Sequence, residues 1–527
     1  MKMSLQKGII FFLITFSIYC ALNLGLTWDE DFLIYMQGKR TAEYLLSLGR
    51  IDEDIFRGAY YSPSYYTLKY MLINIFPLQF RVEVSYLINL FFSFLVILGT
   101  KKFVELLFNK EVGKIVFLIL FFYPAFFGHM AFNSKDTIIA LCHIWIFYLL
   151  LDYIKKGNLK KNSANNFYLI GLLAAIGSGI NMFFLGSMLS VALIVLVEIF
   201  FTKIILSKNF NLKIFFKHIL KSFLVFYFVL ILFWIDTHPD ILTLPFKILY
   251  EWVFGGLMRG YPFMLFDGNH YVFTDIPKSY LFENLLFRSP EYFLISYVLF
   301  FLIFFSIKFF KNNFKQFNYK ITIILIMVLN PFIIVFLTPF SIYDGLRHVL
   351  WLIPYFCIIP SLVIYYLYKN IDLIKIRFIS GIMFFLIIFF LFNFFRLTPY
   401  QYTYLNIFSG NNKDHVNKFE NDYWGSSISK LIKKFNLNKE EKFIYTVCGL
   451  NREAVEIYLK KEGYFNTSMV SYDKADYIIM INRATLKKNT KEYKSKNVTN
   501  CYAKHPGKNV IEIKRNNVVL SVLRKIN

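Results

Sequence analysis

Apolar segments long enough to cross a lipid bilayer recur through residues 1–398, and they restrict the fold of this chain more than any other feature. A bilayer requires about 20 residues of predominantly apolar helix. Roughly eleven segments approach that length: 8–26, 84–100, 114–130, 136–153, 167–181, 183–202, 218–235, 290–308, 320–338, 347–367 and 377–396. With 57% hydrophobic and only 17% charged residues, the chain is not a soluble globular enzyme. We therefore predict an all-α polytopic membrane domain of about eleven transmembrane helices.

The fifth and sixth segments form one long apolar stretch that is divided only around 177–181, where the sequence reads Gly-Ser-Gly-Ile-Asn. We expect two helices here, and a single long kinked helix is the alternative. Lys2 and Lys7 flank the start of the first segment, as they would in a signal sequence. No convincing cleavage site follows, so we expect that segment to remain as the first helix.

Basic residues crowd one alternate set of loops, namely 101–113, 154–166, 203–217, 309–319 and 368–376. The acidic and histidine-containing motifs fall in the other set. Short cytoplasmic loops are enriched in Lys and Arg, so we expect an inner (plasma) membrane protein with its N-terminus in the cytoplasm. The same topology, with contact to anionic lipid, accounts for the net charge of +24 without a nucleic-acid partner.

Residues 399–527 differ in kind, because their apolar runs shorten to strand length, as in 443–447 and 477–481. A helix is predicted over 451–461, and a terminal hairpin turns at Asn516-Asn517. This pattern predicts a small α/β extracytoplasmic domain after the membrane domain. Cys448 and Cys501 are the only cysteines in this polar region; they permit a disulfide, but the sequence does not decide whether it forms.

An acidic motif, Trp28-Asp29-Glu30-Asp31, follows the first segment directly and opens the long outer loop 27–83. Carboxylates at a membrane boundary are unfavourable unless they are solvated, metal-bound or used in chemistry. One could accept a proton from a hydroxyl group while its neighbour holds a divalent cation. The alternative is an acidic helix cap that faces water.

Other polar motifs lie on the same predicted face. In the loop 131–135, Lys135 could bind a phosphate at a helix N-terminus beside Asp136, although capping alone explains Asp136. His238 and Asp240 open the outer loop 236–289, where His238 could equally be an interfacial histidine. Arg347-His348 begin the tenth segment, and an arginine there suits a phosphate at headgroup depth or simple snorkelling.

The sequence contains neither a GxxxxGK[ST] phosphate loop nor a GxGxxG motif between a strand and a helix. Chemistry on the outer face therefore needs a donor that is already activated, such as a lipid-linked phosphate, and no nucleotide is expected as cofactor.

The order of these motifs resembles the GT-C glycosyltransferases, in particular their bacterial protein-mannosyltransferase-like branch. The matching stretches are 29–30, 133–136 and 344–348, with 399–406 and 422–427 similar to a junction found in one subgroup. Each motif alone is weak evidence. Together, however, their order and their shared predicted side of the membrane are fairly specific, and the resemblance covers nearly the whole chain. The resemblance implies a GT-C-like membrane domain over 1–398 with long outer loops at 27–83 and 236–289.

The resemblance implies inverting transfer of a sugar from a polyprenyl-phosphate donor to a lipid, glycan or protein acceptor outside the cytoplasm. Asp29 would act as, or assist, the general base at the catalytic centre, and Glu30 beside it would support it or ligate a cation. The donor phosphate would be bound by Lys135, Arg347 and His348. Further candidates to support the site or hold Mg²⁺ or Mn²⁺ are Asp136, His238 and Asp240.

The sequence departs from the family pattern at two positions. The family often has proline where Ser134 stands, and the subgroup often has arginine near the position of Asn181, so one possible phosphate contact is missing. Three other functions stay open. They are a polysaccharide ligase or polymerase, a flippase or transporter of a lipid-linked sugar, and an assembly subunit in which the outer domain binds a partner.

Overall fold

The structure is a computed structural model that describes residues 2–30, 36–50, 62–159, 164–254, 263–304, 308–337, 342–410, 414–487 and 494–526. Within these ranges six helices are long and apolar enough to cross a membrane, or seven if one bent pair counts as a single span. The protein is therefore an integral membrane protein with a mostly helical first part. The six are α5 (Arg81–Leu107), α8 (Asp136–Lys156), α10 (Phe183–Val197, continued as a π-helix to Thr202), α11 (Leu212–Phe233), α16 (Phe317–Leu337) and α19 (Ile374–Arg396).

Each of the other predicted spans also corresponds to helical structure, but in shorter or broken form. Three apolar helices are shorter than the six: Gln6–Leu22 within α1 (Lys2–Leu22), α9 (Asn165–Ile180) and Ile353–Lys369. The last of these combines α17 (Ile353–Phe356) and α18 (Ile358–Lys369). The bent pair consists of α13 (Tyr280–Arg288) and the helix Glu291–Leu302, whose first part is α14 (Glu291–Leu299). The chain bends by 111° between the two helices. The helix of the predicted tenth span begins at Ile353, so Arg347 and His348 precede it.

The predicted span 114–130 is divided into α6 (Lys110–Phe121) and α7 (Pro124–His129). Proline has no backbone N–H to continue the helix, and it disfavours helical backbone at the residue before it. Tyr123 accordingly adopts an extended conformation with φ −70° and ψ 115°. After the break, Nε2 of His129 at the end of α7 lies 3.1 Å from the hydroxyl oxygen of Tyr423.

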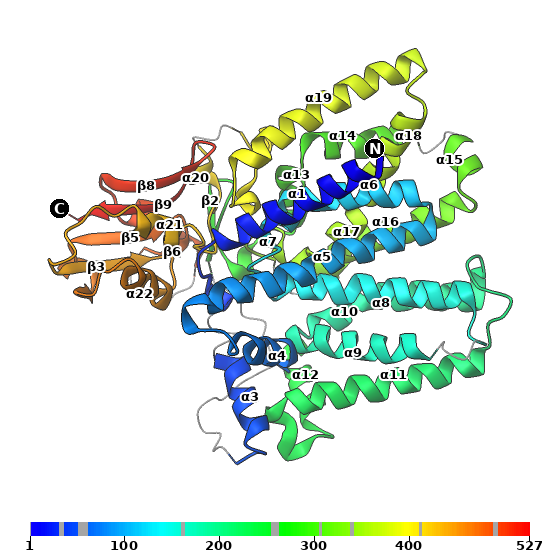
Figure 1. Ribbon diagram of the computed structural model, residues 1–527, viewed down its shortest axis with the longest axis horizontal. Helices are drawn as coiled ribbons and strands as arrows, with labels where there is room; N and C mark the ends of the chain where they lie inside the picture. The colour runs from blue at the N-terminus through cyan, green and yellow to red at the C-terminus, as the bar shows by residue number, and fades with distance from the viewer. Residues whose placement is uncertain are drawn as a thin grey trace.

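The long apolar stretch 167–202 forms two helices, α9 and α10, as expected. Asn181 between them is extended, with φ −160° and ψ 121°, and its Oδ1 accepts a hydrogen bond from the N–H of Phe183 at 3.0 Å. In Figure 1 the two helices lie side by side. Asn181, near whose position the subgroup often has arginine, thus ends α9 as its C-cap and bonds through its side chain to the start of α10.

The two long loops 27–83 and 236–289 contain structure of their own. The first carries α2 (Trp28–Glu30), α3 (Lys39–Leu46) and α4 (Ser64–Ile73), and α4 packs against α9 and α11 (Figure 1). The second carries α12 (Leu244–Phe254) and a two-stranded antiparallel sheet of β1 (Phe263–Phe266) and β2 (Asn269–Val272). Short helices elsewhere are α15 (Lys308–Asn313), α20 (His415–Lys418), α21 (Ile428–Lys433) and α23 (Cys501–Lys504).

The C-terminal part folds around a five-stranded sheet in the order β4-β3-β5-β9-β8. Its strands are β3 (Phe443–Cys448), β4 (Thr467–Met469), β5 (Tyr477–Ile481), β8 (Asn509–Arg515) and β9 (Val518–Lys525). A separate pair joins β6 (Ala484–Leu486) to β7 (Val498–Asn500). The predicted strands, the helix α22 (Arg452–Lys461) and the terminal hairpin are confirmed. Asn516 and Asn517 turn that hairpin with φ of 45° and 65°, which asparagine tolerates better than most residues.

The sheet region, orange and red in Figure 1, lies at one end of the helices, where α1 ends. It touches the start of the first loop directly, because Leu26 N–H donates to the Tyr458 hydroxyl at 2.7 Å and Gly25 N–H donates to the Ser426 carbonyl at 2.8 Å. Cys448 and Cys501 form a disulfide inside this region. The sheet is thus anchored to the segment that leads to Asp29.

Candidate active site

Arg347 lies at the centre of a charged cluster at the end of the helices that faces the sheet. Its Nη1 is 3.3 Å from Asp29 Oδ2, and its Nε is 3.4 Å from Asp344 Oδ2. The rings of Tyr343 and Trp424 each lie 4.8 Å from the guanidinium carbon. The structure thus brings the acidic motif and the arginine of the tenth segment into contact.

The charge on Arg347 is strongly favoured although its side chain is buried. Burial alone would lower the pKa of the guanidinium, but Tyr343, Asp344 and Asp29 raise that pKa well above its ordinary value. A permanently charged, weakly hydrated guanidinium between two aromatic rings is well suited to bind a phosphate.

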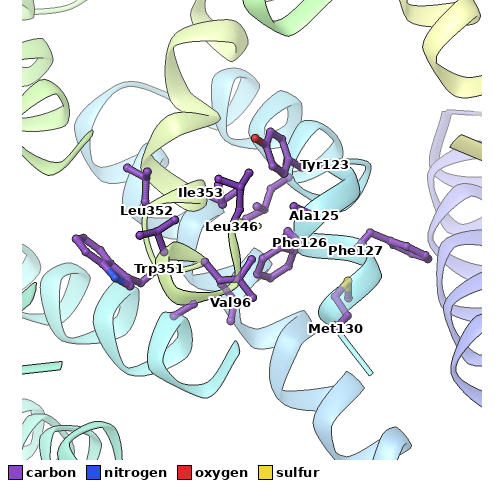
Figure 2. Close-up of a cluster of buried hydrophobic side chains, with 14 of the residues drawn as sticks. Val96, Tyr123, Ala125, Phe126, Phe127, Met130, Leu346, Trp351, Leu352 and Ile353 are labelled. Carbon is purple, nitrogen blue, oxygen red and sulfur yellow. The ribbon is translucent and has the colours of Figure 1, made fainter. Parts of the chain in front are cut away.

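A buried apolar cluster supports the loop that carries Arg347. Figure 2 shows Leu346, Trp351, Leu352 and Ile353 packed beside Val96 of α5 and the side chains of α7. The turn before Arg347 has left-handed backbone at Asp344 (φ 56°) and Gly345 (φ 69°). Gly345 N–H donates to the Tyr280 hydroxyl at 2.8 Å, so this unusual turn is fixed by α13 as well as by packing.

Asp29 is the most accessible carboxylate of the cluster. Its side chain is 35% exposed, compared with 6% for Asp344 and 2% for Glu30. It is thus the acid that a substrate hydroxyl could reach. Asp31, the third acid of the motif, lies outside the described residues.

Glu30 points into the protein and forms a buried ion pair with Lys69 of α4, at 3.3 Å. Ser85 and Ser134 donate hydrogen bonds to its two oxygens at 2.7 and 2.6 Å. Burial lowers the pKa of Lys69, and Glu30 opposes that shift. Through these contacts Glu30 links the first loop to α4, to α5 and to the loop just before α8. Ser134 supplies a hydrogen bond that proline, the residue often found there in the family, would lack.

Asp136 begins α8 and is held by Asn133, whose Nδ2 donates to Asp136 Oδ2 at 3.0 Å. Asn133 Oδ1 accepts from the N–H of Asp136 at 2.9 Å, which caps the helix. Asp136 is one of the carboxylates that act electrostatically on Arg347. Among the described hydrogen bonds, Asn133 and not Asp136 accepts from the backbone at the start of α8. The predicted capping role of Asp136 is therefore not seen, and Asp136 lies near the cluster.

His348 is a direct neighbour of Arg347, and the charge of Lys135 acts on it. His348 Nε2 accepts a hydrogen bond from Arg347 Nε at 3.2 Å, and its ring packs on Tyr343. Loss of solvation, followed by the charges of Arg347 and Lys135, keeps the pKa of His348 well below its ordinary value. His348 is thus a hydrogen-bond acceptor toward Arg347, and its predicted contact with the donor phosphate stays a prediction. Lys135 remains a partly exposed cation near it.

His238 and Asp240 were predicted to support the site, but their contacts lie elsewhere. His238 contacts the Tyr44 hydroxyl of α3 at 3.3 Å and the Ile231 carbonyl at 3.0 Å. Asp240 accepts from the N–H groups of Leu242 and Thr243 in a local turn, and the Thr243 hydroxyl lowers the pKa of its carboxyl. Among the described contacts neither residue touches the Arg347 cluster.

The sequence interpretation missed Arg483, which enters the cluster from the sheet region. Its Nη1 lies 2.6 Å from Asp344 Oδ1 and 3.6 Å from Glu420 Oε2. Nothing in the local sequence marks Arg483, because its partner Asp344 is 139 residues away.

The described residues contain no group of three or more His, Cys, Asp or Glu side chains arranged to hold a metal ion. Asp29 and Asp344 both face the guanidinium of Arg347. The expected divalent cation stays a prediction.

No protein-family model matches the chain, and comparison with curated proteins finds no match either. Among solved structures it is similar to ArnT from Cupriavidus metallidurans bound to undecaprenyl phosphate, with 10% identity, 98% of each chain covered and a TM-score of 0.49. The apo ArnT structure gives 10% identity over 90% of this chain and 93% of ArnT, with a TM-score of 0.47. The oligosaccharyltransferase AglB from Archaeoglobus fulgidus gives 11% identity over 90% and 70%, with a TM-score of 0.37. Likenesses at this level decide neither the family nor the activity.

Proposed function

We propose that this protein is a GT-C-type glycosyltransferase that moves a sugar from a polyprenyl-phosphate donor to an acceptor hydroxyl outside the cytoplasm. The observation that carries the proposal is the pairing of Asp29, an accessible carboxylate, with the buried guanidinium of Arg347. A proton acceptor and a phosphate-binding cation are the two groups that such a transfer requires side by side.

In the proposed step the acceptor oxygen forms a bond to the anomeric carbon, and the bond from that carbon to the phosphate oxygen breaks. Asp29 takes the acceptor proton, and polyprenyl phosphate leaves with the bonding electron pair. Attack opposite the leaving group inverts the anomeric centre. Negative charge grows on the departing phosphate, so Arg347 and Lys135 stabilise the transition state more than the ground state.

The proposed orientation places the N-terminus in the cytoplasm and the sheet region outside, in the inner (plasma) membrane. Lys155 and Lys156 end α8 at the opposite end from Asp136, in agreement with the excess of basic residues in short inner loops. A lipid-linked donor suits a site at the outer boundary, because no nucleotide-binding loop is present in the sequence.

The test is transfer from radiolabelled polyprenyl-phosphate sugars by purified protein in lipid, with a membrane extract as the source of acceptor. Wild type is expected to move label into a new product. Asp29→Asn removes the base and should slow turnover about 10²–10⁴-fold, the usual contribution of general acid–base catalysis. Asp473→Asn is the matched control, because Asp473 is an exposed acid of the sheet region and should transfer at the wild-type rate.

Two results would contradict the proposal. Full turnover by a correctly inserted Asp29→Asn protein would remove Asp29 as the base. A wild-type protein that carries a fluorescent lipid-linked sugar across the bilayer without transferring it would be a flippase.

A further inference from the structure

From the sheet region Arg483 reaches into the charged cluster, and it is only 4% exposed. Its Nη1 and Nη2 face the two oxygens of Asp344 at 2.6 and 3.4 Å. This two-pronged geometry is the strongest form of an arginine–carboxylate contact. Arg483 therefore faces both oxygens of Asp344, and Asp344 Oδ2 faces Arg347 as well.

Arg483 is itself held tightly by its own region. Its carbonyl accepts a hydrogen bond from Cys501 N–H at 2.9 Å, directly beside the disulfide to Cys448. Its Nη1 also donates to the Tyr423 carbonyl at 3.1 Å. A Cβ on Gly449 would come within 2.6 Å of the Cβ of Arg483, so glycine is needed there for the close approach.

The resulting cluster alternates in sign along Asp29, Arg347, Asp344, Arg483 and Glu420. If Arg483 were absent, both oxygens of Asp344 would be available to Arg347. A two-pronged pair with Asp344 would then draw Arg347 away from Asp29 and from an incoming phosphate. With Arg483 in place, Arg347 stays in contact with both Asp29 and Asp344 and does not pair with Asp344 alone.

We propose that Arg483 is a positioning residue of the active site: by engaging Asp344 it holds Arg347 in place to receive the donor phosphate. The inference rests on the proposed function and gives the C-terminal region a defined part in it. The region also fixes the other side of the site, through the contact of Leu26 with Tyr458.

The test compares Arg483→Gln with Arg524→Gln. Arg524 is a matched control because it is a buried arginine of the same region, and its hydrogen bonds go to Asn509, Tyr502 and His505 within that region. Two quantities are measured in lipid, namely kcat/KM for transfer and the Kd for undecaprenyl phosphate. We expect Arg483→Gln to lose about tenfold or more in both, as for loss of a charged hydrogen bond, and Arg524→Gln to keep both values.

A double-mutant cycle separates positioning from general support of the fold. If Arg483 acts through Asp344, the double variant Arg483→Gln/Asp344→Asn should be no worse than Asp344→Asn alone. Arg483→Lys keeps the positive charge but lacks the two-pronged guanidinium, so its loss of kcat/KM and of affinity should be intermediate. This variant replaces Arg483→Gln in the test if Arg483→Gln does not fold. Thermal midpoints confirm that each variant is folded.

Additive losses in the cycle, or equal losses in Arg483→Gln and Arg524→Gln, would overturn the inference. A wild-type protein that binds undecaprenyl phosphate without transferring sugar would contradict the proposed function, while the binding cycle would still decide the role of Arg483. Failure of wild type to bind or transfer would remove both.

Discussion

At the residue scale, Glu30 and Lys69 form the most deeply buried ion pair of the described region, at 2% and 0% side-chain exposure. Breaking such a pair by removing one partner costs about 3–5 kcal/mol, because the other charge stays buried without compensation. Glu30→Gln and Lys69→Met should each lower the thermal midpoint of the detergent-solubilised protein strongly. The double variant Glu30→Gln/Lys69→Met should recover much of that loss.

The same double variant decides between two roles for Glu30. If Glu30 only braces the site, the stabilised double variant should regain transfer activity together with its thermal midpoint. A double variant that is stable but inactive would instead support the direct catalytic role predicted from the sequence. Activity and midpoint should therefore be measured on the same preparation.

His415 gives stability a pH dependence. Its Nε2 lies 3.0 Å from the Ser409 hydroxyl, and burial, which the Gly410 backbone opposes, lowers its pKa to about 4. The unfolded chain gains a proton below pH ~6.5 while the folded chain does not. Stability is therefore lost as pH falls from about 6.5 toward 4, by about 1.4 kcal/mol per pH unit for this group. His415→Gln should flatten the decline of the thermal midpoint between pH 7 and 5, and an unchanged decline would contradict this assignment.

Single residues were predictable where a motif stands at a helix end. Asp29, Asp136 and Arg347 were identified that way, and the structure brings them to one cluster. His238 follows α11 in the same manner but faces α3, because sequence shows which end of a helix a residue occupies and not which side of the bundle. Arg483 was beyond reach for a related reason, since only the folded topology brings β5 and β6 beside the turn at Asp344.

At the element scale, α7 packs so closely on the chain after α19 that only glycine fits. A Cβ on Gly128 would lie 2.2 Å from the backbone nitrogen of Tyr402, whose hydroxyl bonds with Asp422 and Ser426. Gly128→Ala should destabilise by about 1–3 kcal/mol or more, since backbone must shift. Gly381→Ala is the control, because a Cβ there has no neighbour within 4 Å. The thermal midpoint of this control should stay level or rise, and equal losses in both variants would contradict the packing argument.

Helices and strands were predictable from the length of the apolar segments and from the alternation of apolar residues. The positions at which helices break were harder to predict. The division of α9 from α10 and the hairpin at Asn516-Asn517 carry local turn signals and were found. The break between α6 and α7 depends on Pro124 within a continuous apolar run, which length alone counts as one span. The strands β1 and β2 were not predicted. The short runs 263–266 and 269–272 lie in the long loop 236–289, which was interpreted from its charged residues and not from strand patterns.

At the scale of the whole molecule, the helices and the sheet meet at the charged cluster, so the orientation in the membrane decides which compartment the site faces. The disulfide of Cys448 with Cys501 offers a test of the proposed orientation, because disulfides persist outside the cytoplasm and are rare within it. Cys20, Cys142 and Cys357 are free and buried, so they interfere little with labelling from the surface.

In intact cells a membrane-impermeant maleimide should label the protein only after reduction, at Cys448 and Cys501. Lys208→Cys, an exposed position in the predicted inner loop 203–217, should become labelled only after the membrane is permeabilised. The bridge spans 53 residues, so in the chain-entropy model Cys448→Ser/Cys501→Ser should lose about 4 kcal/mol of stability. Transfer should fall with it, since Arg483 bonds to Cys501. Labelling of Lys208→Cys in intact cells would reverse the orientation and place the site in the cytoplasm, where a lipid-linked donor is no longer required.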